Sequence, residues 1–209
     1  RSSFTREEIE GYAQEIQLTS KRLNELLENL LNWARLQSGS LPIAPATIDF
    51  PRLLNQILRL FQPAASAKAI SISAEAGGIQ SVRSDPEILR TILRNLVSNA
   101  IEHTPGGGSV TLGARRDGSA LLVSVADSGG GIPQETLDAL TNDLLHSRQD
   151  GKGFGLVLCR EMAEILGGTI EVDRHDESGT TFVLRVPGAA DASPAGSTSE
   201  LKTAAENHR

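Results

Sequence analysis

Three groups of residues whose types and spacing suit nucleotide chemistry follow one another along this chain of 209 residues. The first group is Asn95, Asn99 and His103, spaced four residues apart. The second is the run Asp-Ser-Gly-Gly-Gly at residues 127–131, and the third is Gly-Lys-Gly-Phe-Gly at residues 151–155. Each group is a weak signal alone, but their order and spacing together predict an ATP-binding pocket.

A spacing of four places Asn95, Asn99 and His103 on one stripe of a helix whose other positions are mostly apolar. Such a polar stripe is costly unless its amides find partners. An asparagine oxygen is a hard ligand of the kind that Mg²⁺ accepts alongside phosphates and waters. The alternative is that these amides bond to neighbouring backbone, and this group taken alone favours that interpretation.

Asp127 ends a predicted strand and is followed by glycines at 129 and 131. A carboxylate in an apolar pocket can accept a hydrogen bond from the amino group of adenine. Glycines beside it allow the backbone to approach a flat base closely. The alternative is an ordinary Asp-Ser-Gly turn at the end of a strand.

The third group precedes a predicted helix, where free backbone N–H groups and the helix dipole favour a phosphate. Lys152 would add positive charge near the terminal phosphates. The alternative is a flexible loop that lets a helix pack close to a sheet. The run is not a Walker loop, because no Gly-Lys-Ser/Thr ending exists. It also lacks the strand-to-helix context of a dinucleotide fingerprint.

The surrounding sequence predicts three parts. Residues 5–37 carry apolar positions at alternating steps of three and four, which predicts one long helix that needs a partner helix. We therefore interpret residues 1–40 as a dimerisation-type helix, the alternative being a core helix of a single globular domain. Residues 45–188 form the predicted ATP-binding domain, and residues 189–209 are predicted to be a disordered tail or linker.

Within the predicted ATP-binding domain, periodicity and turn residues define the expected elements. The predicted helices span 50–61, 86–102, 133–145 and 154–166. A single strand is predicted at 70–73 and a mobile loop at 146–152. Two hairpins are predicted, one pairing 109–116 with 119–126 and the other pairing 169–172 with 180–186.

The charge, the cysteine content and the apolar runs of the chain exclude several classes of protein. The net charge of -6 argues against a nucleic-acid-binding protein, which needs clustered Lys and Arg. A single cysteine, Cys159, excludes an intramolecular disulfide, suits a reducing compartment, and is expected to be a buried apolar residue. No run of about 18 apolar residues predicts a membrane span. Since the chain opens at Arg1 without a signal pattern, we expect a cytoplasmic fragment whose membrane anchor, if any, lies upstream.

Together these motifs resemble those of the sensor histidine kinases over about residues 5–187. The asparagine stripe resembles their N box, and the two glycine-rich groups resemble their two glycine boxes. Gly-Thr-Thr-Phe at 179–182 resembles the short block on their final hairpin. The helix that ends near residue 39 resembles the second helix of their dimerisation and phosphoacceptor domain.

The resemblance implies an α+β fold of the Bergerat type, an α/β sandwich in which helices cover one face of a mixed sheet, with ATP and Mg²⁺ as ligands. It makes Asn99 the metal ligand, with Asn95 and His103 supporting the phosphates and the metal. Asp127 is the residue that would recognise adenine. It assigns catalysis to Asn95, Asn99 and Lys152, and the loop 146–152 to the ATP lid. The remaining residues that it assigns to the nucleotide are Gly129, Gly131, Gly153, Phe154, Gly155, Leu156, Thr180 and Thr181.

As partners, the resemblance implies a response-regulator receiver domain and a homodimer in the full-length parent. The chain departs from the family pattern in two places. No Phe lies between the two glycine boxes, and no histidine has the setting of a phosphoacceptor. The four histidines are His103, His146, His175 and His208. We therefore expect that the acceptor helix is not in this chain.

Position 95 distinguishes subclasses of the wider superfamily. Gyrase and the heat-shock chaperones place a Glu general base four residues before the metal Asn, where this chain has Asn95. An amide cannot take a proton from water, so the sequence favours phosphoryl transfer to a protein imidazole over rapid hydrolysis. The alternatives are a degenerate scaffold that docks a response regulator without ATP, and a serine kinase of the anti-sigma type, which lacks the long helix.

Overall fold

The structure, a computed structural model, describes residues 43–131, 154–176 and 178–189, together with single positions 5, 11, 12, 16, 20 and 31. The predicted helix 133–145, the predicted loop 146–152 and most of the predicted helix 5–37 lie outside the described residues. The elements are β1 (Ala46–Asp49), α2 (Phe50–Ala67), β2 (Ser71–Glu75), β3 (Ser81–Ser84), α3 (Pro86–His103), β4 (Ser109–Asp117), β5 (Ala120–Asp127), α5 (Phe154–Ile165), β6 (Thr169–Asp176) and β7 (Gly179–Val186).

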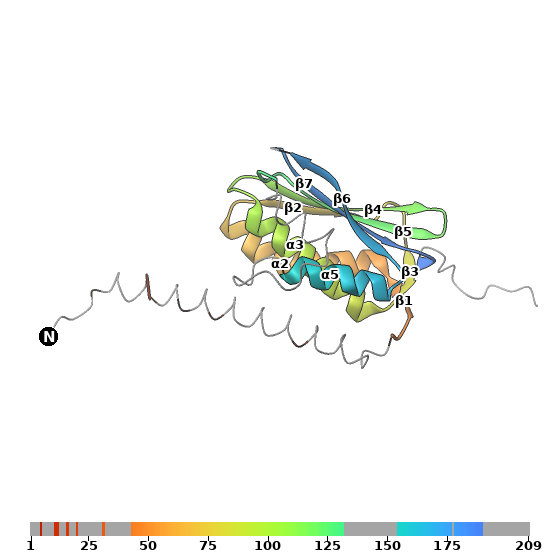
Figure 1. Ribbon diagram of the computed structural model, residues 1–209. Helices are drawn as coiled ribbons and strands as arrows, with labels where there is room; N and C mark the ends of the chain where they lie inside the picture. The colour runs from red at the N-terminus through yellow and green to blue at the C-terminus, as the bar shows by residue number, and fades with distance from the viewer. Residues whose placement is uncertain are drawn as a thin grey trace, which may run out of the picture.

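Five strands form one mixed sheet in the order β2-β4-β5-β7-β6. The pair β2–β4 is parallel and the other pairs are antiparallel. The helices α2, α3 and α5 lie together on one face of this sheet (Figure 1). β1 and β3 form a separate antiparallel pair. This architecture confirms the predicted fold class.

Local chemistry explains where α2 and α3 begin. Asp49 caps α2 by accepting the backbone N–H of Arg52 at 3.0 Å, and a proline occupies the first turn. Asp85 caps α3 in the same way, accepting Glu87 N at 2.9 Å and Ile88 N at 3.0 Å. The sequence rule that an aspartate before a proline opens a helix is therefore confirmed at the start of α3.

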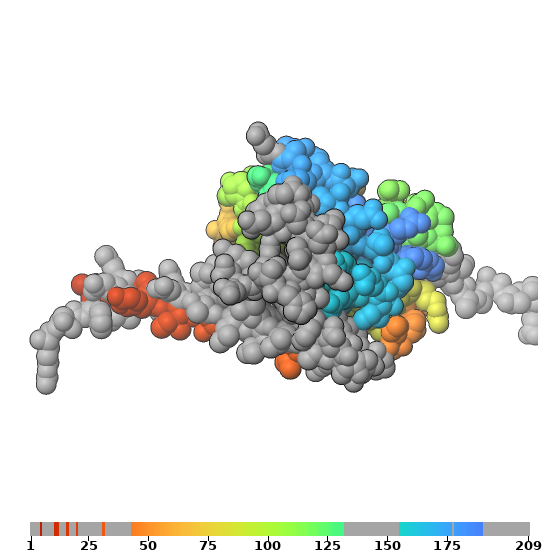
Figure 2. Space-filling model, in the orientation of Figure 1, coloured from red at the N-terminus to blue at the C-terminus, as the bar shows by residue number. Residues whose placement is uncertain are grey.

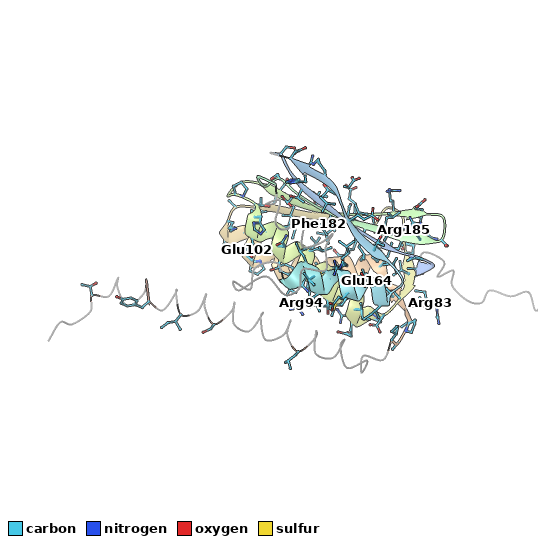
Figure 3. The ribbon with its side chains drawn as sticks, in the orientation of Figure 1. Arg83, Arg94, Glu102, Glu164, Phe182 and Arg185 are labelled. Carbon is cyan, nitrogen blue, oxygen red and sulfur yellow. The ribbon has the colours of Figure 1, made fainter. Side chains whose placement is uncertain are left out.

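The apolar core lies between the sheet and the helical layer, and α3 is at its centre. α3 contacts α2, α5, β4 and β5, so most of its surface is covered. Phe182 of β7, labelled in Figure 3, is buried at the interface between the layers. The buried residues of α3 are Ile88, Leu89, Ile92, Leu93, Leu96, Val97, Ala100 and Ile101. Such a helix has little freedom to move without disturbing the core.

The connection from α5 to β6 passes very close to β7. Gly167 has φ +69°, and its N–H bonds to the Glu164 carbonyl oxygen at 2.8 Å. A Cβ on Gly168 would lie 2.0 Å from the carbonyl oxygen of Arg185, so only glycine fits there. Figure 2 shows α5 and β6 as neighbours on one face of the molecule, as this tight turn requires.

Three features differ from the sequence prediction. The pair β1–β3 was not predicted, because four-residue strands carry little periodicity. α2 continues beyond the predicted end at residue 61 and includes Pro63, at the cost of one backbone hydrogen bond. β6 runs past residue 172 through an irregularity in its pairing.

The predicted domain boundaries stay predictions. Among the described helices, none combines the length and the apolarity that a membrane span requires.

Candidate nucleotide-binding site

The carboxylate of Asp127 is held by one of its two oxygens. Asp127 is the last residue of β5 and is 6% exposed. Its Oδ1 accepts the N–H of Gly129 at 2.8 Å and the N–H of Thr180 at 3.3 Å. No donor to Oδ2 is found in the described part of the chain. A buried carboxylate with one fixed oxygen and one available oxygen is suited to accept a hydrogen bond from a ligand.

Two glycines bring the backbone close around this carboxylate. A Cβ on Gly179, which has φ +130°, would lie 1.8 Å from the carbonyl oxygen of Asp127. A Cβ on Gly129 would lie 2.7 Å from the His103 carbonyl oxygen and 2.8 Å from Asp127 Oδ1. The end of α3, the loop after β5 and the start of β7 therefore meet at Asp127.

Strand parity distinguishes the two threonines that the sequence analysis proposed. Ala126 pairs with Thr181, and Val125 with Phe182, so Thr180 lies on the same face of the sheet as Asp127. Thr180 is 1% exposed, and its Oγ1 has no hydrogen-bond partner among the described residues. Thr181 is half-buried on the opposite face. The structure therefore brings Thr180, and not Thr181, to Asp127.

A buried hydroxyl without a partner costs free energy, of the order of 1–3 kcal/mol. Such a group in a folded protein calls for an explanation, and a ligand or an ordered water supplies one. Thr180 Oγ1 and Asp127 Oδ2 together offer a donor and an acceptor at one place. The residues present thus fit the edge of a purine base.

On α3 the three polar residues of the N-box motif are less buried. Asn95 and Asn99 are half-buried and His103 is exposed. Asn95 Nδ2 donates to the Thr91 carbonyl oxygen at 3.1 Å, so this amide does bond to neighbouring backbone, as the alternative interpretation proposed. Its Oδ1 is not engaged by that bond. For Asn99 no hydrogen bond is found within the described ranges, which leaves its amide oxygen available to a ligand.

Other predicted residues lie around this site or outside the described residues. Gly131 has φ +81°, and a Cβ there would lie 2.9 Å from the Asp176 carbonyl oxygen and 3.2 Å from His175 Nδ1. Gly155 is half-buried in the first turn of α5, and Leu156 is buried.

Phe154 begins α5, but its side chain is outside the described part, as are Lys152 and Gly153. The phosphate-binding role that the sequence analysis gave to residues 151–155 therefore stays a prediction.

Sequence reasoning missed two contributors to this site. Ser128 exchanges two hydrogen bonds with Ser109, through its Oγ and its N–H, and so fixes the loop after Asp127 to β4. His175 lies against Gly131 because β6 continues beyond its predicted end. Ser128 lies within the Asp-Ser-Gly run, but nothing in the sequence indicates its bonds to Ser109, and His175 belongs to no motif. Only the pairing of strands distant in sequence brings their contacts to the site.

Cys159 takes no part in this chemistry. It is fully buried in α5, and its Sγ lies 3.8 Å from the Ile92 carbonyl oxygen of α3. Burial raises the pKa of its thiol far above the ordinary value, so the thiol stays protonated and is a poor nucleophile. The prediction of a buried apolar cysteine is confirmed.

Comparison with known proteins identifies the class to which this fold belongs. Residues 84–190 match the family of histidine kinase-, DNA gyrase B- and HSP90-like ATPases. The chain belongs to this family. The match runs from the end of β3 to the residues just after β7 and thus includes every part of the site described above.

Sensor kinases are the relatives found by sequence. The chain is 32% identical over 169 residues to the alginate biosynthesis sensor protein KinB of Pseudomonas aeruginosa, covering 79% of this chain and 28% of that protein. It is 31% identical over 195 residues to the adaptive-response sensory kinase SasA of Synechococcus elongatus, covering 89% of this chain and 50% of that protein. The chain therefore spans half or less of these curated relatives.

Solved structures of histidine kinases share the fold. Full-length ShkA in complex with AMPPNP superimposes with a TM-score of 0.72 at 26% identity, covering 90% of this chain and 40% of that one. Histidine kinase ThkA in complex with the response regulator TrrA gives 0.69 at 22% identity, covering 91% of this chain and 55% of that one. These relatives place the chain among the ATP-binding domains of sensor histidine kinases.

Proposed function

We propose that this chain is the ATP-binding catalytic part of a sensor histidine kinase. It would bind ATP with Mg²⁺ and promote transfer of the γ-phosphoryl group to a histidine on a helix outside residues 1–209. The observation that carries this proposal is the pair Asp127 and Thr180, with one carboxylate oxygen held by backbone and a buried hydroxyl beside it. Membership of the ATPase family supplies the identity of the ligand.

Asp127 would accept a hydrogen bond from the adenine amino group through Oδ2. Thr180 Oγ1 would complete the polar edge of the base site by donating to a ring nitrogen or through a water. Both groups are already oriented by the sheet, so binding costs little reorganisation. Val125 and Phe182, two residues away on the same face of the two strands, belong to the apolar core, which would keep water from these polar contacts and strengthen them.

Asn99 would hold Mg²⁺ through its amide oxygen, with Asn95 Oδ1 and His103 near the phosphates and Lys152 contributing positive charge. Bound Mg²⁺ would neutralise charge on the phosphates and orient them. Phosphoryl transfer depends mainly on such positioning and charge stabilisation. In the transfer, the bond between the β–γ bridging oxygen and the γ-phosphorus breaks, an N–P bond to the imidazole forms, and ADP leaves.

The amide at position 95 favours this acceptor over water. Hydrolysis needs a base to take a proton from the attacking water, and Asn95 cannot act as one. An imidazole nitrogen carries its own lone pair and needs no such base. Slow hydrolysis protects the bound nucleotide until the acceptor histidine arrives.

The partners proposed for the parent protein follow from its relatives. A structure of ThkA was solved in complex with the response regulator TrrA, and we propose a receiver domain of that class as the next phosphoryl acceptor here. We also propose that the parent dimerises through the helix predicted in residues 1–40. Since ATP is available in the cytoplasm, the domain would work there.

The direct test is phosphoryl transfer to an acceptor supplied in trans. The chain is incubated with γ-labelled ATP and Mg²⁺ and a separately purified kinase dimerisation domain that carries its acceptor histidine. We expect label that is acid-labile and base-stable, as phosphohistidine is, and none on a His→Gln acceptor. If the folded chain binds ATP but labels only serine, or labels nothing, the histidine kinase proposal is wrong.

A further inference from the structure

The aspartate that caps α3 also binds the segment of chain that enters the domain. Asp85 Oδ2 accepts the backbone N–H of Ala44 at 2.9 Å, across 41 positions of sequence. Its other oxygen, Oδ1, accepts Glu87 N and Ile88 N in the first turn of α3. Asp85 is 6% exposed. One buried carboxylate therefore joins the entering segment to the start of the helix that carries the N-box residues.

The pairing of two short strands next to this bond also holds the entering segment in place. β1 begins two residues after Ala44, and it pairs with β3, which ends directly before Asp85. Ala46 is opposite Ser84 in this pair. The β1–β3 pairing thus fixes the entering segment against β3, and the Ala44–Asp85 bond fixes it against α3.

α3 can transmit a change at its first turn to the nucleotide site. It is an unbroken helix of 18 residues with eight buried apolar side chains, and its last residue, His103, contacts the loop after Asp127. A close-packed core has low compressibility and transmits strain, so a shift at one end of such a helix is carried along it. A displacement of its first turn would therefore change the distance between Asn99 and Asp127.

We propose that Asp85 is a positioning residue of the nucleotide site, through which the entering segment and bound nucleotide influence each other. The bond between Ala44 and Asp85 holds α3 where Asn99 and Asp127 can contact one nucleotide together. Loss of the bond would weaken nucleotide binding, and bound nucleotide would strengthen the bond. The effect on nucleotide rests on the proposed function.

Two variants break this bond by different routes. Asp85→Asn keeps an oxygen for the helix cap, since asparagine caps helices as well as aspartate, but turns an NH₂ group toward the Ala44 N–H. Ala44→Pro removes the donor and leaves the cap intact. Residue 44 already precedes Pro45, so its backbone is biased to extended conformations that suit proline. The double variant tests whether both changes act on the same bond.

Asp49→Asn is the matched control. Asp49 caps α2 with Oδ1, as Asp85 caps α3, but it is exposed, and within the described residues its side chain bonds to Arg52 of its own helix. The same change of one atom there tests whether loss of a capping charge has any effect by itself.

Amide exchange measured without nucleotide tests the connection itself. In Asp85→Asn we expect the Ala44 amide to exchange about tenfold faster or more, since a bond to a buried charged group is lost. In Ala44→Pro we expect faster exchange in the first turn of α3. If α3 exchanges equally in Ala44→Pro and the wild type, the coupling is overturned whatever the nucleotide result.

Calorimetric titration of ATP with Mg²⁺ tests the effect on the site. We expect each single variant to weaken binding about fivefold, at the lower end of measured couplings between sites. The double variant should bind no more weakly than the weaker single variant, and Asp49→Asn should match the wild type. By reciprocity, ATP should slow exchange of the Ala44 amide in the wild type by the same factor.

Three outcomes would contradict the proposal or its basis. Wild-type affinity in both single variants, with a confirmed change in exchange, would make the bond purely structural. Additive losses in the double variant would mean that the two changes do not act through one bond. If the folded wild type binds no ATP, the proposed function itself is wrong. The amide exchange of α3 in Ala44→Pro still shows, without nucleotide, whether the entering segment is coupled to α3.

Discussion

On the β5–β7 side of the site, Asp127 and Thr180 are buried, and backbone N–H groups hold the carboxylate in place. On the α3 side, Asn95 and Asn99 are half-buried, His103 is exposed, and the side-chain hydrogen bond of Asn95 stays within the helix. The first side is built by backbone that passes within contact distance of itself at Gly179 and Gly129. The second is built by side chains on a rigid helix.

This difference corresponds to two kinds of ligand. A flat base of fixed shape can be matched by a preformed edge, and rigidity there reduces the cost of binding. Phosphates with Mg²⁺ carry water and change geometry during transfer, so adjustable side chains suit them better. Substitutions on the two sides should consequently differ: a change to the closely packed backbone of the sheet side should lower stability, whereas a change at Asn99 on the helix side should reduce binding alone.

The largest expected effect on stability comes from Gly179→Ala. The new Cβ would meet the Asp127 carbonyl oxygen at 1.8 Å, and φ +130° is unfavourable for any residue with a side chain. Strain and displacement of this kind should lower the free energy of unfolding by roughly 3 kcal/mol. Urea unfolding measures it.

Gly118→Ala is the control for that change. Gly118 also has positive φ, +58°, but a Cβ there meets nothing within 4 Å, so the cost should be only about 1 kcal/mol. Equal losses for the two variants would mean that the close approach at Asp127 does not contribute.

Asn99→Ala should reduce binding without reducing stability. Its amide oxygen has no assigned partner among the described residues, and alanine is the better helix former by roughly half a kcal/mol. We expect ATP affinity with Mg²⁺ to fall about tenfold, the order of one charge-assisted contact, and affinity without Mg²⁺ to change little. Ser98→Ala, one position away on α3, serves as the control. If ATP affinity falls equally with and without Mg²⁺, the assignment of Asn99 as a metal ligand is wrong.

Thr180→Val tests the buried hydroxyl at almost constant shape. Removing a buried polar group without a partner should leave stability unchanged or raise it. ATP affinity should fall by about fivefold, as for one neutral hydrogen bond of about 1 kcal/mol. Thr181→Val, on the opposite face of the sheet, should leave affinity unaltered. If the two variants lower ATP affinity equally, the face of the sheet on which a threonine lies does not determine which one contacts the nucleotide.

The smallest effect is expected far from the site, at the exposed ion pair of Asp117 with Arg185. The Arg185 guanidinium holds the pKa of the Asp117 carboxyl below its ordinary value. A lowered folded-state pKa gives stability that is present above the unfolded pKa and is lost as pH falls through the folded one. Asp117→Asn should thus slightly destabilise the protein at neutral pH and not in strong acid, with ATP binding unchanged. Unfolding by denaturant at constant temperature, at each of the two pH values, measures this change in stability.

Much of this architecture follows from local sequence. Asp85 before Pro86 predicts the start of α3, and the Asp-Gly turn at 117–118 predicts the β4–β5 hairpin, because both depend on neighbouring residues alone. Asp127 could likewise be placed at the end of a strand and beside glycines. These features give the fold class and one half of the site.

Features that depend on pairing between distant segments could not be predicted. The choice between Thr180 and Thr181 requires the register of β7 against β5, which reverses with a shift of one residue. The Ala44–Asp85 bond requires the pairing of β1 with β3, two strands too short to show periodicity. Nothing in the sequence near either aspartate distinguishes Asp85 from Asp49 as the one that also binds the entering chain.

The most direct test of the central claim compares ATP with ITP, in which a carbonyl oxygen replaces the adenine amino group. In the wild type, Asp127 Oδ2 should favour ATP by roughly tenfold or more, the order of a hydrogen bond to a charged group.

In Asp127→Asn, the N–H groups of Gly129 and Thr180 keep the amide oxygen at the Oδ1 position, so Nδ2 faces the base. We predict that ATP affinity falls and that the preference for ATP over ITP disappears or reverses, with folding retained. Equal binding of both nucleotides to the wild type, or an unaltered preference in the variant, would contradict the assignment of Asp127 to adenine.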